Sequence, residues 1–255
     1  MKRGYVDTSD GQIHYITDGV GDPILLLHST PMSSDQFYQL IPILAKKSRV
    51  VAMDTLGYGL SDRPSRRYSA EDYASSIRSF LKELGIKKTS VFGNFTGASL
   101  AIEFAVKYPK QVDKLLLAGV MLKPSPPYVS DIVPTEDGSF LLEAWNTFYK
   151  PPRPFVGEEA AYRMFISGLL AGTGQSCACH AATSADNSKK MPHIESPTLL
   201  VSGEQDMFCE NLEPAQRLIP RSKMKVIPGG GFSIAYSNPV EFAEVALDFL
   251  ESPGV

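Results

Sequence analysis

The chain is poor in several features that mark particular classes of protein. Its 255 residues include only 3 cysteines and 1 tryptophan, and no uninterrupted run of about 18 apolar residues occurs. So few cysteines exclude a disulfide scaffold and indicate free thiols in a reducing compartment. The missing apolar run predicts no transmembrane helix, and Met1–Tyr5 leads into polar residues rather than a signal peptide. We therefore expect a soluble, cytoplasmic protein with no membrane partner.

The chain also lacks a strong charge of either sign. Its 25 basic and 28 acidic residues give a formal net charge of −3, and no long basic run occurs. Proteins that bind nucleic acids usually carry a basic stripe that neutralises phosphates. We therefore expect no nucleic-acid partner. The oligomeric state that we expect is a monomer or a homodimer.

The sequence does have the composition of a globular protein, and its patterns predict alternating strands and helices. Hydrophobic residues make up 43% and charged residues 21% of the chain, which is enough for a substantial core. Continuous apolar runs indicate strands buried on both faces. Two N-terminal segments alternate more between apolar and polar residues and indicate a hairpin at the sheet edge. Helical patterns lie between the buried strands. This order predicts an α/β protein with a doubly wound, mostly parallel eight-stranded sheet. The predicted buried strands are Ile24–His28, Val50–Met53, Ser90–Phe92, Lys114–Ala118, Thr198–Ser202 and Met224–Ile227; the hairpin is Gly4–Thr8 with Gln12–Thr17; the helices are Ser69–Leu84, Thr96–Tyr108 and Pro239–Glu251.

One stretch interrupts this alternation. Leu122–His193 has no strand-like run, but it has several prolines, the single tryptophan Trp145 and two helical patterns. This composition is typical of a helical insertion. We predict a core formed by residues 1–121 and 194–255, with a helical cap at residues 122–193.

A glycine-flanked turn lies between a predicted buried strand and a helix. It reads Gly93-Asn94-Phe95-Thr96-Gly97, the spacing of a nucleophile elbow, in which a tight turn raises the central side chain above the sheet. We expect the flanking glycines to be required because a Cβ there would collide with the neighbouring strand or helix. Asn94 is expected to brace the turn from behind.

With this turn the chain resembles the α/β-hydrolase superfamily, in particular lactonase- and esterase-like members with a helical cap. Further segments match it in order: Leu27–Pro31 at the oxyanion loop, Ala52–Asp54 with the glycines that follow, Pro197–Asp206, and Pro228–Phe232 before the final helix. The resemblance covers nearly the whole chain outside the cap. It implies the α/β-hydrolase fold.

The departures from this family concern its catalytic residues. Phe95 stands where the family carries its nucleophile, and Phe232 stands where it carries its histidine. A benzyl group neither attacks a carbonyl nor shuttles a proton, so the resemblance implies a site without the usual Ser-His-Asp mechanism. We expect the two rings to touch, with centroids about 4.5–7 Å apart, and to form an apolar pocket floor.

Asp206 alone occupies its expected triad position. An unpaired buried carboxylate is costly. Asp206 should therefore accept hydrogen bonds from backbone amides or water, or act as an acid or base itself. The resemblance also implies an oxyanion hole formed by the amides of Thr30 and Thr96, because that feature requires positioned N–H groups rather than particular side chains. We take Asp206, Thr96 and Thr30 as the candidate catalytic residues.

The candidate substrate-binding residues come from the oxyanion loop, the two phenylalanines and the cap. They are His28, Ser29, Phe95, Phe232, Trp145 and His180. Cys177, Cys179 and His180 offer only three neighbouring ligands and no second cluster, so we predict no metal site and no cofactor.

Three functional hypotheses follow. The preferred one is a non-hydrolytic enzyme of lyase, decarboxylase, cyclase or isomerase type that polarises a small hydrophobic carbonyl compound, as in secondary-metabolite biosynthesis. The alternative is a catalytically inactive pseudo-hydrolase that binds a small molecule. The third, given least weight, is an esterase with a nucleophile relocated to Thr96 or Ser233. The preferred hypothesis predicts no turnover of activated esters beyond the rate in buffer.

Overall fold

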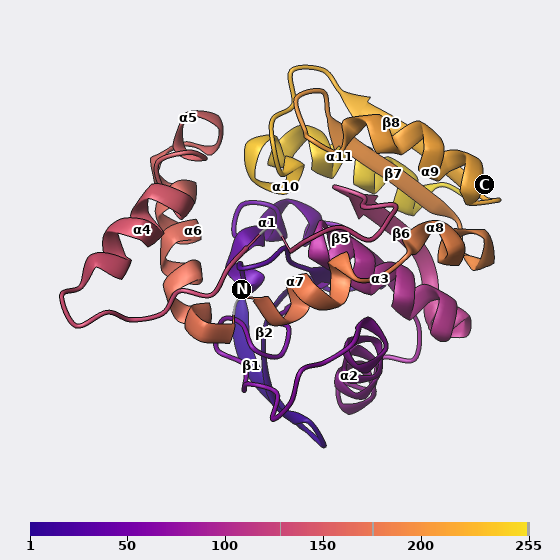
Figure 1. The fold of residues 1–255 in the computed structure, drawn as a ribbon. Helices are drawn as coiled ribbons and strands as arrows, with labels where there is room; N and C mark the ends of the chain where they lie inside the picture. Colours follow the sequence, from indigo (N-terminus) through magenta and orange to yellow (C-terminus); the bar gives the residue numbers. More distant parts are fainter. Residues whose placement is uncertain (128, 175, 254–255) are drawn as a thin grey trace.

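The computed structural model describes residues 1–127, 129–174 and 176–253, and these build one eight-stranded sheet (Figure 1). The strand order is β1-β2-β4-β3-β5-β6-β7-β8. β2 runs antiparallel to both β1 and β4, and the other neighbours are parallel. The predicted fold class is confirmed. The strands are β1 Lys2–Thr8, β2 Gly11–Asp18, β3 Pro23–Leu27, β4 Arg49–Met53, β5 Thr89–Asn94, β6 Val112–Ala118, β7 Thr198–Gly203 and β8 Ser222–Ile227.

The central strands are buried on both faces, which is why their sequences are continuous apolar runs rather than alternating ones. Helices cover each face of the sheet (Figure 1). One core cluster packs α2 and α3 on one face, and a second packs α1 and α11 on the other. The core helices are α1 Ile41–Leu44, α2 Ala70–Glu83, α3 Thr96–Lys107, α9 Leu212–Leu218, α10 Ile234–Ser237 and α11 Pro239–Glu251.

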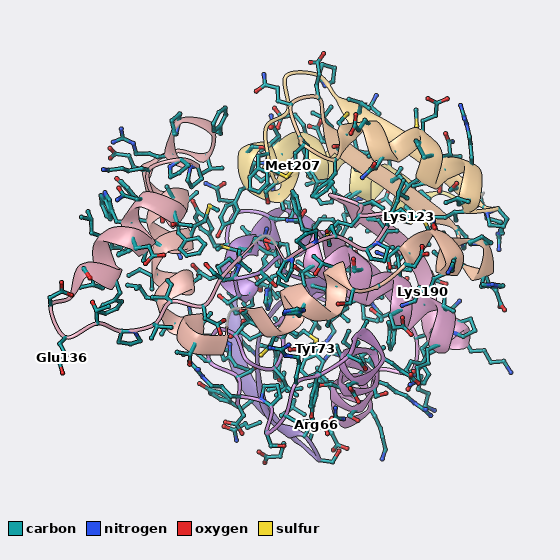
Figure 2. The ribbon with its side chains drawn as sticks, in the orientation of Figure 1. Arg66, Tyr73, Lys123, Glu136, Lys190 and Met207 are labelled. Carbon is teal, nitrogen blue, oxygen red and sulfur yellow. The ribbon has the colours of Figure 1, made fainter. Side chains whose placement is uncertain are left out.

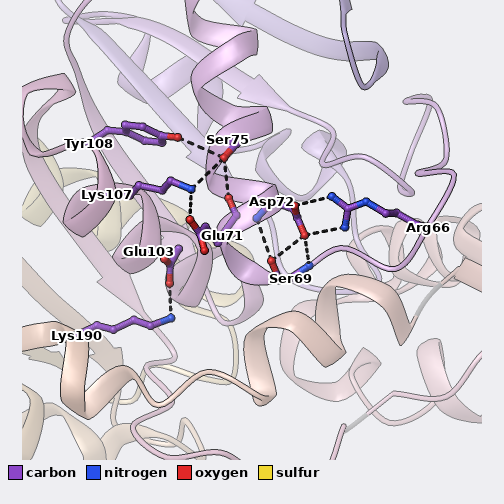
Figure 3. Close-up of polar contacts among 9 residues, drawn as sticks. All are labelled: Arg66, Ser69, Glu71, Asp72, Ser75, Glu103, Lys107, Tyr108 and Lys190. Carbon is purple, nitrogen blue, oxygen red and sulfur yellow. Dashed lines mark hydrogen bonds and ion pairs between the residues drawn. The ribbon is translucent and has the colours of Figure 1, made fainter.

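Helix α2 begins where the sequence predicts it. The hydroxyl of Ser69 accepts a hydrogen bond from the amide of Asp72, and the Asp72 carboxylate accepts one from the Ser69 amide, which together form a capping box. Figure 3 shows this pair and the guanidinium of Arg66 that binds the same carboxylate. On the neighbouring surface, Lys107 of α3 pairs with Glu71 of α2 (Figure 3).

The chain between β6 and β7 is helical. Figure 1 shows α4, α5 and α6 together at one side of the sheet, whereas α7 and α8 lie along α3. These helices all fall within the predicted cap of residues 122–193. They are α4 Ser139–Phe148, α5 Arg153–Val156, α6 Glu158–Ala171, α7 Ser176–Thr183 and α8 Asn187–Lys190. The short 3-10 turns of the chain are η1 Ser34–Phe37, η2 Pro109–Gln111, η3 Gly172–Gly174, η4 Met191–His193 and η5 Cys209–Asn211.

Among the described residues, no helix combines the length and the apolar character that a membrane crossing requires.

Candidate active site

The turn between β5 and α3 has the strained backbone of a nucleophile elbow. Phe95 has φ 51° and ψ −108°, in a region that residues other than glycine rarely adopt. A Cβ on Gly93 would lie 2.3 Å from the carbonyl oxygen of Gly97, and a Cβ on Gly97 would lie 2.1 Å from that of Leu27. The steric reason predicted for the two glycines is confirmed.

The elbow side chain is packed among other aromatic rings. The Phe95 and Phe232 centroids are 4.9 Å apart with an interplanar angle of 48°, which confirms the predicted contact. Phe208 adds an edge-on ring 5.5 Å from Phe95. A Cβ on Gly119, just after β6, would lie 2.7 Å from the Phe95 ring. The sequence analysis missed Phe208 and Gly119, since no local pattern connects either of them to the elbow.

Asp206 follows β7 and is held by two backbone amides. One carboxylate oxygen accepts a hydrogen bond of 2.9 Å from the Phe208 amide, and the other accepts one of 3.4 Å from the Ser233 amide. Burial raises the pKa of Asp206, and the two backbone bonds only partly oppose that shift. Asp206 thus accepts hydrogen bonds from backbone amides, as expected, where the family has a histidine partner. Asp206 does not line the apolar pocket above Phe95, as far as the described residues show.

A buried hydrogen-bond network joins the loops around the elbow at Ser233. The Ser233 hydroxyl accepts bonds from Asn94 Nδ2 at 2.9 Å and from Gln36 Nε2 at 3.1 Å. Gln36 Oε1 in turn accepts bonds from the amide of Ser29 at 2.8 Å and from its hydroxyl at 3.3 Å. Through Gln36, Asn94 and Asp206, Ser233 thus connects the oxyanion loop, the elbow and the loop after β7. We call these side chains the Ser233 network.

The predicted bracing role of Asn94 agrees with this network. Ser233 itself has a left-handed backbone, with φ 56° and ψ 76°, and it is 2% exposed. The role of Gln36 was missed, because its partner Ser233 is 197 positions away.

The two predicted oxyanion residues lie side by side. The amide of Thr30 is 3.4 Å from the Thr96 hydroxyl and donates to it. Thr96 is the first residue of α3, so the positive end of that helix dipole lies at the same place. In this structure the Thr30 amide already has a protein acceptor, and the oxyanion hole stays a prediction.

An apolar pocket of about 390 Å³ opens above Phe95 and Phe232. Cap and core each supply part of its wall, and none of the described lining residues carries a charged side chain. Figure 2 labels one of them, Met207, on the loop after β7, a residue that is 67% exposed. The lining residues are Ser29, Thr30, Pro31, Met32, Phe95, Val129, Thr147, Phe148, Pro151, Pro152, Phe155, Met164, Gln205, Met207 and Phe232.

The structure brings some of the predicted binding residues to this pocket and leaves others away from it. Ser29, Phe95 and Phe232 line it, as does the catalytic candidate Thr30. His28 lies beneath the loop: its Nδ1 is 2.9 Å from the Ser29 carbonyl oxygen, and its Nε2 accepts the Thr55 amide at 3.0 Å. Burial lowers the pKa of His28, so a neutral imidazole holds the loop.

The two predicted cap residues lie elsewhere. Trp145 stacks on Tyr149 with centroids 3.8 Å apart, and it is not among the described residues lining the pocket. His180 lines a separate groove together with Tyr68, Glu103 and Lys190. Position on a cap helix did not determine which side chains face the pocket, because only some faces of these helices point inward.

No metal site emerges from the part of the chain that the structure describes. Within it, His, Cys, Asp and Glu side chains form no group of three that would hold an ion.

Residues 22–157 match the family described as alpha/beta hydrolase fold. That match covers more than half of the chain. The chain belongs to the alpha/beta hydrolase fold family.

Individual relatives extend the similarity over the full length. The chain is 28% identical to a 2-hydroxy-6-oxononadienedioate/2-hydroxy-6-oxononatrienedioate hydrolase of Pseudomonas putida, over 95% of this chain and 92% of the relative. It is 24% identical to a putative non-heme chloroperoxidase of Synechocystis, over 97% and 98% of the two chains. A hydrolase structure from Pseudomonas aeruginosa superposes with a TM-score of 0.83 at 19% identity, over 98% of each chain, and supports the fold.

These relatives correct the functional expectation. They are named as enzymes, which supports the expectation of an enzyme over a binding protein. The preferred hypothesis of a lyase, decarboxylase, cyclase or isomerase is wrong, and so is the inactive pseudo-hydrolase, because the Pseudomonas putida relative that spans nearly the whole chain is named a hydrolase. Of the three hypotheses, only the esterase, which was given least weight, is a hydrolase.

Proposed function

We propose that this protein is a hydrolase of small, uncharged, largely apolar esters or lactones. The observation that carries the proposal is the apolar pocket, whose described lining residues include Thr30 and Phe95, the N-cap residue of α3, and no charged side chain. An ionised substrate would lose its hydration there without gaining a partner charge. The Pseudomonas putida relative is named for dioates, so the proposed substrate class differs from the one in that name.

The proposed reaction takes Phe95 and Phe232 as the native residues of the nucleophile and base positions. Water then attacks the carbonyl carbon directly, and no covalent acyl-enzyme forms. The Thr30 amide exchanges its 3.4 Å bond to the Thr96 hydroxyl for the carbonyl oxygen, which gains negative charge next to the amides of Thr30 and Thr96. The carbonyl bond then re-forms as the bond to the leaving oxygen breaks. The proton released by water passes to that departing oxygen. Hydrolases stripped of their triad retain about 10³–10⁴-fold catalysis over water from the oxyanion hole and binding alone.

The proposal is tested with p-nitrophenyl butyrate, which is neutral, and with the p-nitrophenyl monoester of glutarate, which carries a charge. We expect turnover of the neutral ester about 10³–10⁴-fold above the uncatalysed rate, a much lower rate for the anionic ester, and no burst. Phe155→Asp places a charge at a pocket-lining position that is 57% exposed, and it should raise KM for the neutral ester. Leu142→Asp is the matched control, since Leu142 is 62% exposed and is not among the pocket-lining residues.

Turnover of both esters at the buffer rate would overturn the proposal. Labelling of a single residue by a fluorophosphonate would overturn direct attack by water, because it would reveal a side-chain nucleophile.

A further inference from the structure

A small cavity of about 70 Å³ adjoins the apolar pocket within the cap. The two spaces share three described lining residues, Val129, Thr147 and Phe148, so these residues form the partition between them. Phe148 has the largest side chain of the three. It is the last residue of α4 and is only 7% exposed. The extent of the pocket in this direction therefore depends on where the Phe148 ring lies.

The Phe148 ring lies directly against a glycine of the neighbouring cap helix. A Cβ on Gly168 of α6 would lie 2.8 Å from Cδ2 of that ring and 3.2 Å from its Cε2. Packed carbon atoms prefer about 3.5–4.0 Å, so a larger residue at position 168 would displace the ring. Glycine is less favourable than alanine inside a helix. The close approach of the ring gives Gly168 a packing role that offsets this cost.

Further contacts keep α4 against α6 at this point. Trp145, one turn before Phe148, lies edge-on to Phe165 of α6 with ring centroids 5.4 Å apart. Phe148 also belongs to a buried cluster with Ile132 and Ala144, and Phe165 packs against that cluster. The Phe148 ring is therefore held from both helices while it borders the two cavities.

The lining of the small cavity disfavours an anionic chain end. Ile132 and Ala144 contribute apolar walls, and the carboxylates of Asp131 and Glu143 also line the cavity. These carboxylates would repel a second negative charge. The Thr147 hydroxyl already donates to the Glu143 carbonyl oxygen at 2.9 Å. A neutral hydrocarbon end fits both this lining and the apolar pocket.

We propose that Phe148, held in place by Gly168, limits the length of the hydrocarbon chain that the apolar pocket accepts. The ring closes the pocket at this end, and the small cavity lies beyond it. The inference rests on the proposed function for the identity of the substrate, a neutral ester or lactone, but the length limit applies to any neutral apolar ligand of the pocket.

The test separates binding from catalysis with 2-alkanones, which carry a neutral carbonyl and are not hydrolysed. Ketones from 2-butanone to 2-decanone are titrated into the full-length protein and followed by NMR of labelled methionine methyl groups, because Met32, Met164 and Met207 line the pocket. In the parent protein, affinity should rise about fourfold per methylene and stop rising at a limiting length. In Phe148→Ala this limit should lie at least about two methylenes further on, so the longest ketones should bind about tenfold more tightly than to the parent.

Two further variants secure the role of the ring. Tyr162→Ala is the matched control: it removes a ring of the cap that is 52% exposed and lines neither cavity, so the limit should not change. Phe148→Leu retains more of the buried bulk and should move the limit in the same direction by less. It therefore gives an answer if the alanine variant does not fold.

Gly168→Ala tests how the ring is held. The added methyl group should displace the ring and change the affinity for the ketones at least about threefold in the parent protein. In combination with Phe148→Ala it should have no effect, because the ring that it displaces is absent. An equal effect in both backgrounds would overturn the role of Gly168.

An unchanged limit in both Phe148 variants would overturn the proposal. The same proteins are then assayed with p-nitrophenyl esters of increasing acyl length. A shifted ketone limit without ester turnover would leave the length limit standing and refute the proposed hydrolysis. Ester turnover whose length profile is the same in the parent and in Phe148→Ala would leave hydrolysis standing and refute the length limit.

Discussion

At the scale of single residues, the most consequential substitutions are the two phenylalanines at the centre of the site. The ring centroids of Phe95 and Phe232 are 4.9 Å apart, and both side chains line the apolar pocket. Offset aromatic contacts of this kind contribute about 0.5–1.5 kcal/mol beyond the burial of their area. The same two side chains make the pocket floor apolar, so they act on both stability and substrate choice.

Replacing both rings tests this dual role. Phe95→Ser with Phe232→His should introduce a burst and at least about tenfold faster turnover of p-nitrophenyl butyrate, because Asp206 already lies where it can orient the new histidine. The same change should weaken binding of a neutral apolar inhibitor, since the floor becomes polar. Stopped-flow absorbance measures the burst. Adding Asp206→Asn should remove most of the gain; a gain that survives it would contradict the assigned role of Asp206.

Asp206 also predicts how stability depends on pH. Burial raises the pKa of its carboxyl in the folded state, so the folded protein binds the proton more tightly than the unfolded chain. This contribution to stability is complete below the unfolded pKa, about 4, and is lost as pH rises through the folded pKa. Asp206→Asn removes the titration. The variant should therefore gain stability relative to the parent protein as pH rises from about 4.

Urea unfolding of the two proteins at a series of pH values measures that difference. A difference that stays constant across the series would show that the carboxyl does not titrate with a raised pKa.

At the scale of elements, the Ser233 network holds together three loops from different parts of the chain. η1 has two roles here: Asp35 binds Arg163 of the cap helix α6, and the next residue, Gln36, binds Ser29 of the oxyanion loop and Ser233. The position of the Thr30 amide therefore depends on contacts made at the neighbouring turn. The proposed reaction has no nucleophile side chain, so it relies on such positioned amides for its catalysis.

Gln36→Leu removes this connection while keeping a side chain of similar size. It leaves the Ser29 amide and the Ser233 hydroxyl without one partner each, and buried groups left in that state cost about 1–3 kcal/mol. We expect a loss of that order in the free energy of unfolding, and a lower kcat with little change in KM, because the amides act on the transition state. Gln12→Leu is the control: its side-chain bond to Asp7 is exposed, so the change should stay within about 0.5 kcal/mol. Equal effects of the two substitutions would contradict the assigned role of Gln36.

At the scale of the whole molecule, the cap is held less firmly than the sheet. In α4 only Ala144 and Phe148 are buried, and in α5 no residue is. By contrast, every residue of β5 and β7 is buried. Segments with little buried apolar surface open locally at low cost, whereas central strands open only with global unfolding.

Hydrogen exchange measures this difference. Amides of α4 and α5 should exchange at least about 100-fold faster than those of β5 and β7. Mass spectrometry of peptic fragments at neutral pH gives both rates in one experiment. Equal protection of the two regions would mean that cap and core unfold as one unit, against the distribution of burial.

Much of the architecture could be predicted from the sequence because its signals are local. Continuous apolar runs such as Ile24–His28 mark buried parallel strands, and Ser69 with Asp72 marks the start of α2. The requirement for glycine at the two elbow positions was predicted for the right reason. A Cβ on Gly93 or on Gly97 would collide with a backbone carbonyl oxygen of a neighbouring segment. Phe95 and Phe232 could be paired because the family resemblance assigns them positions that lie side by side in the fold.

The sequence alone predicted the fold class, the elbow and the two side chains at its centre. Which distant groups meet depended on how the elements pack: Phe208 and Gly119 lie around Phe95, and Gln36 binds Ser233. This packing also turned Trp145 and His180 away from the pocket. The physical reason is that local patterns encode backbone conformation and burial, whereas a site is made of side chains whose distances depend on how whole elements pack.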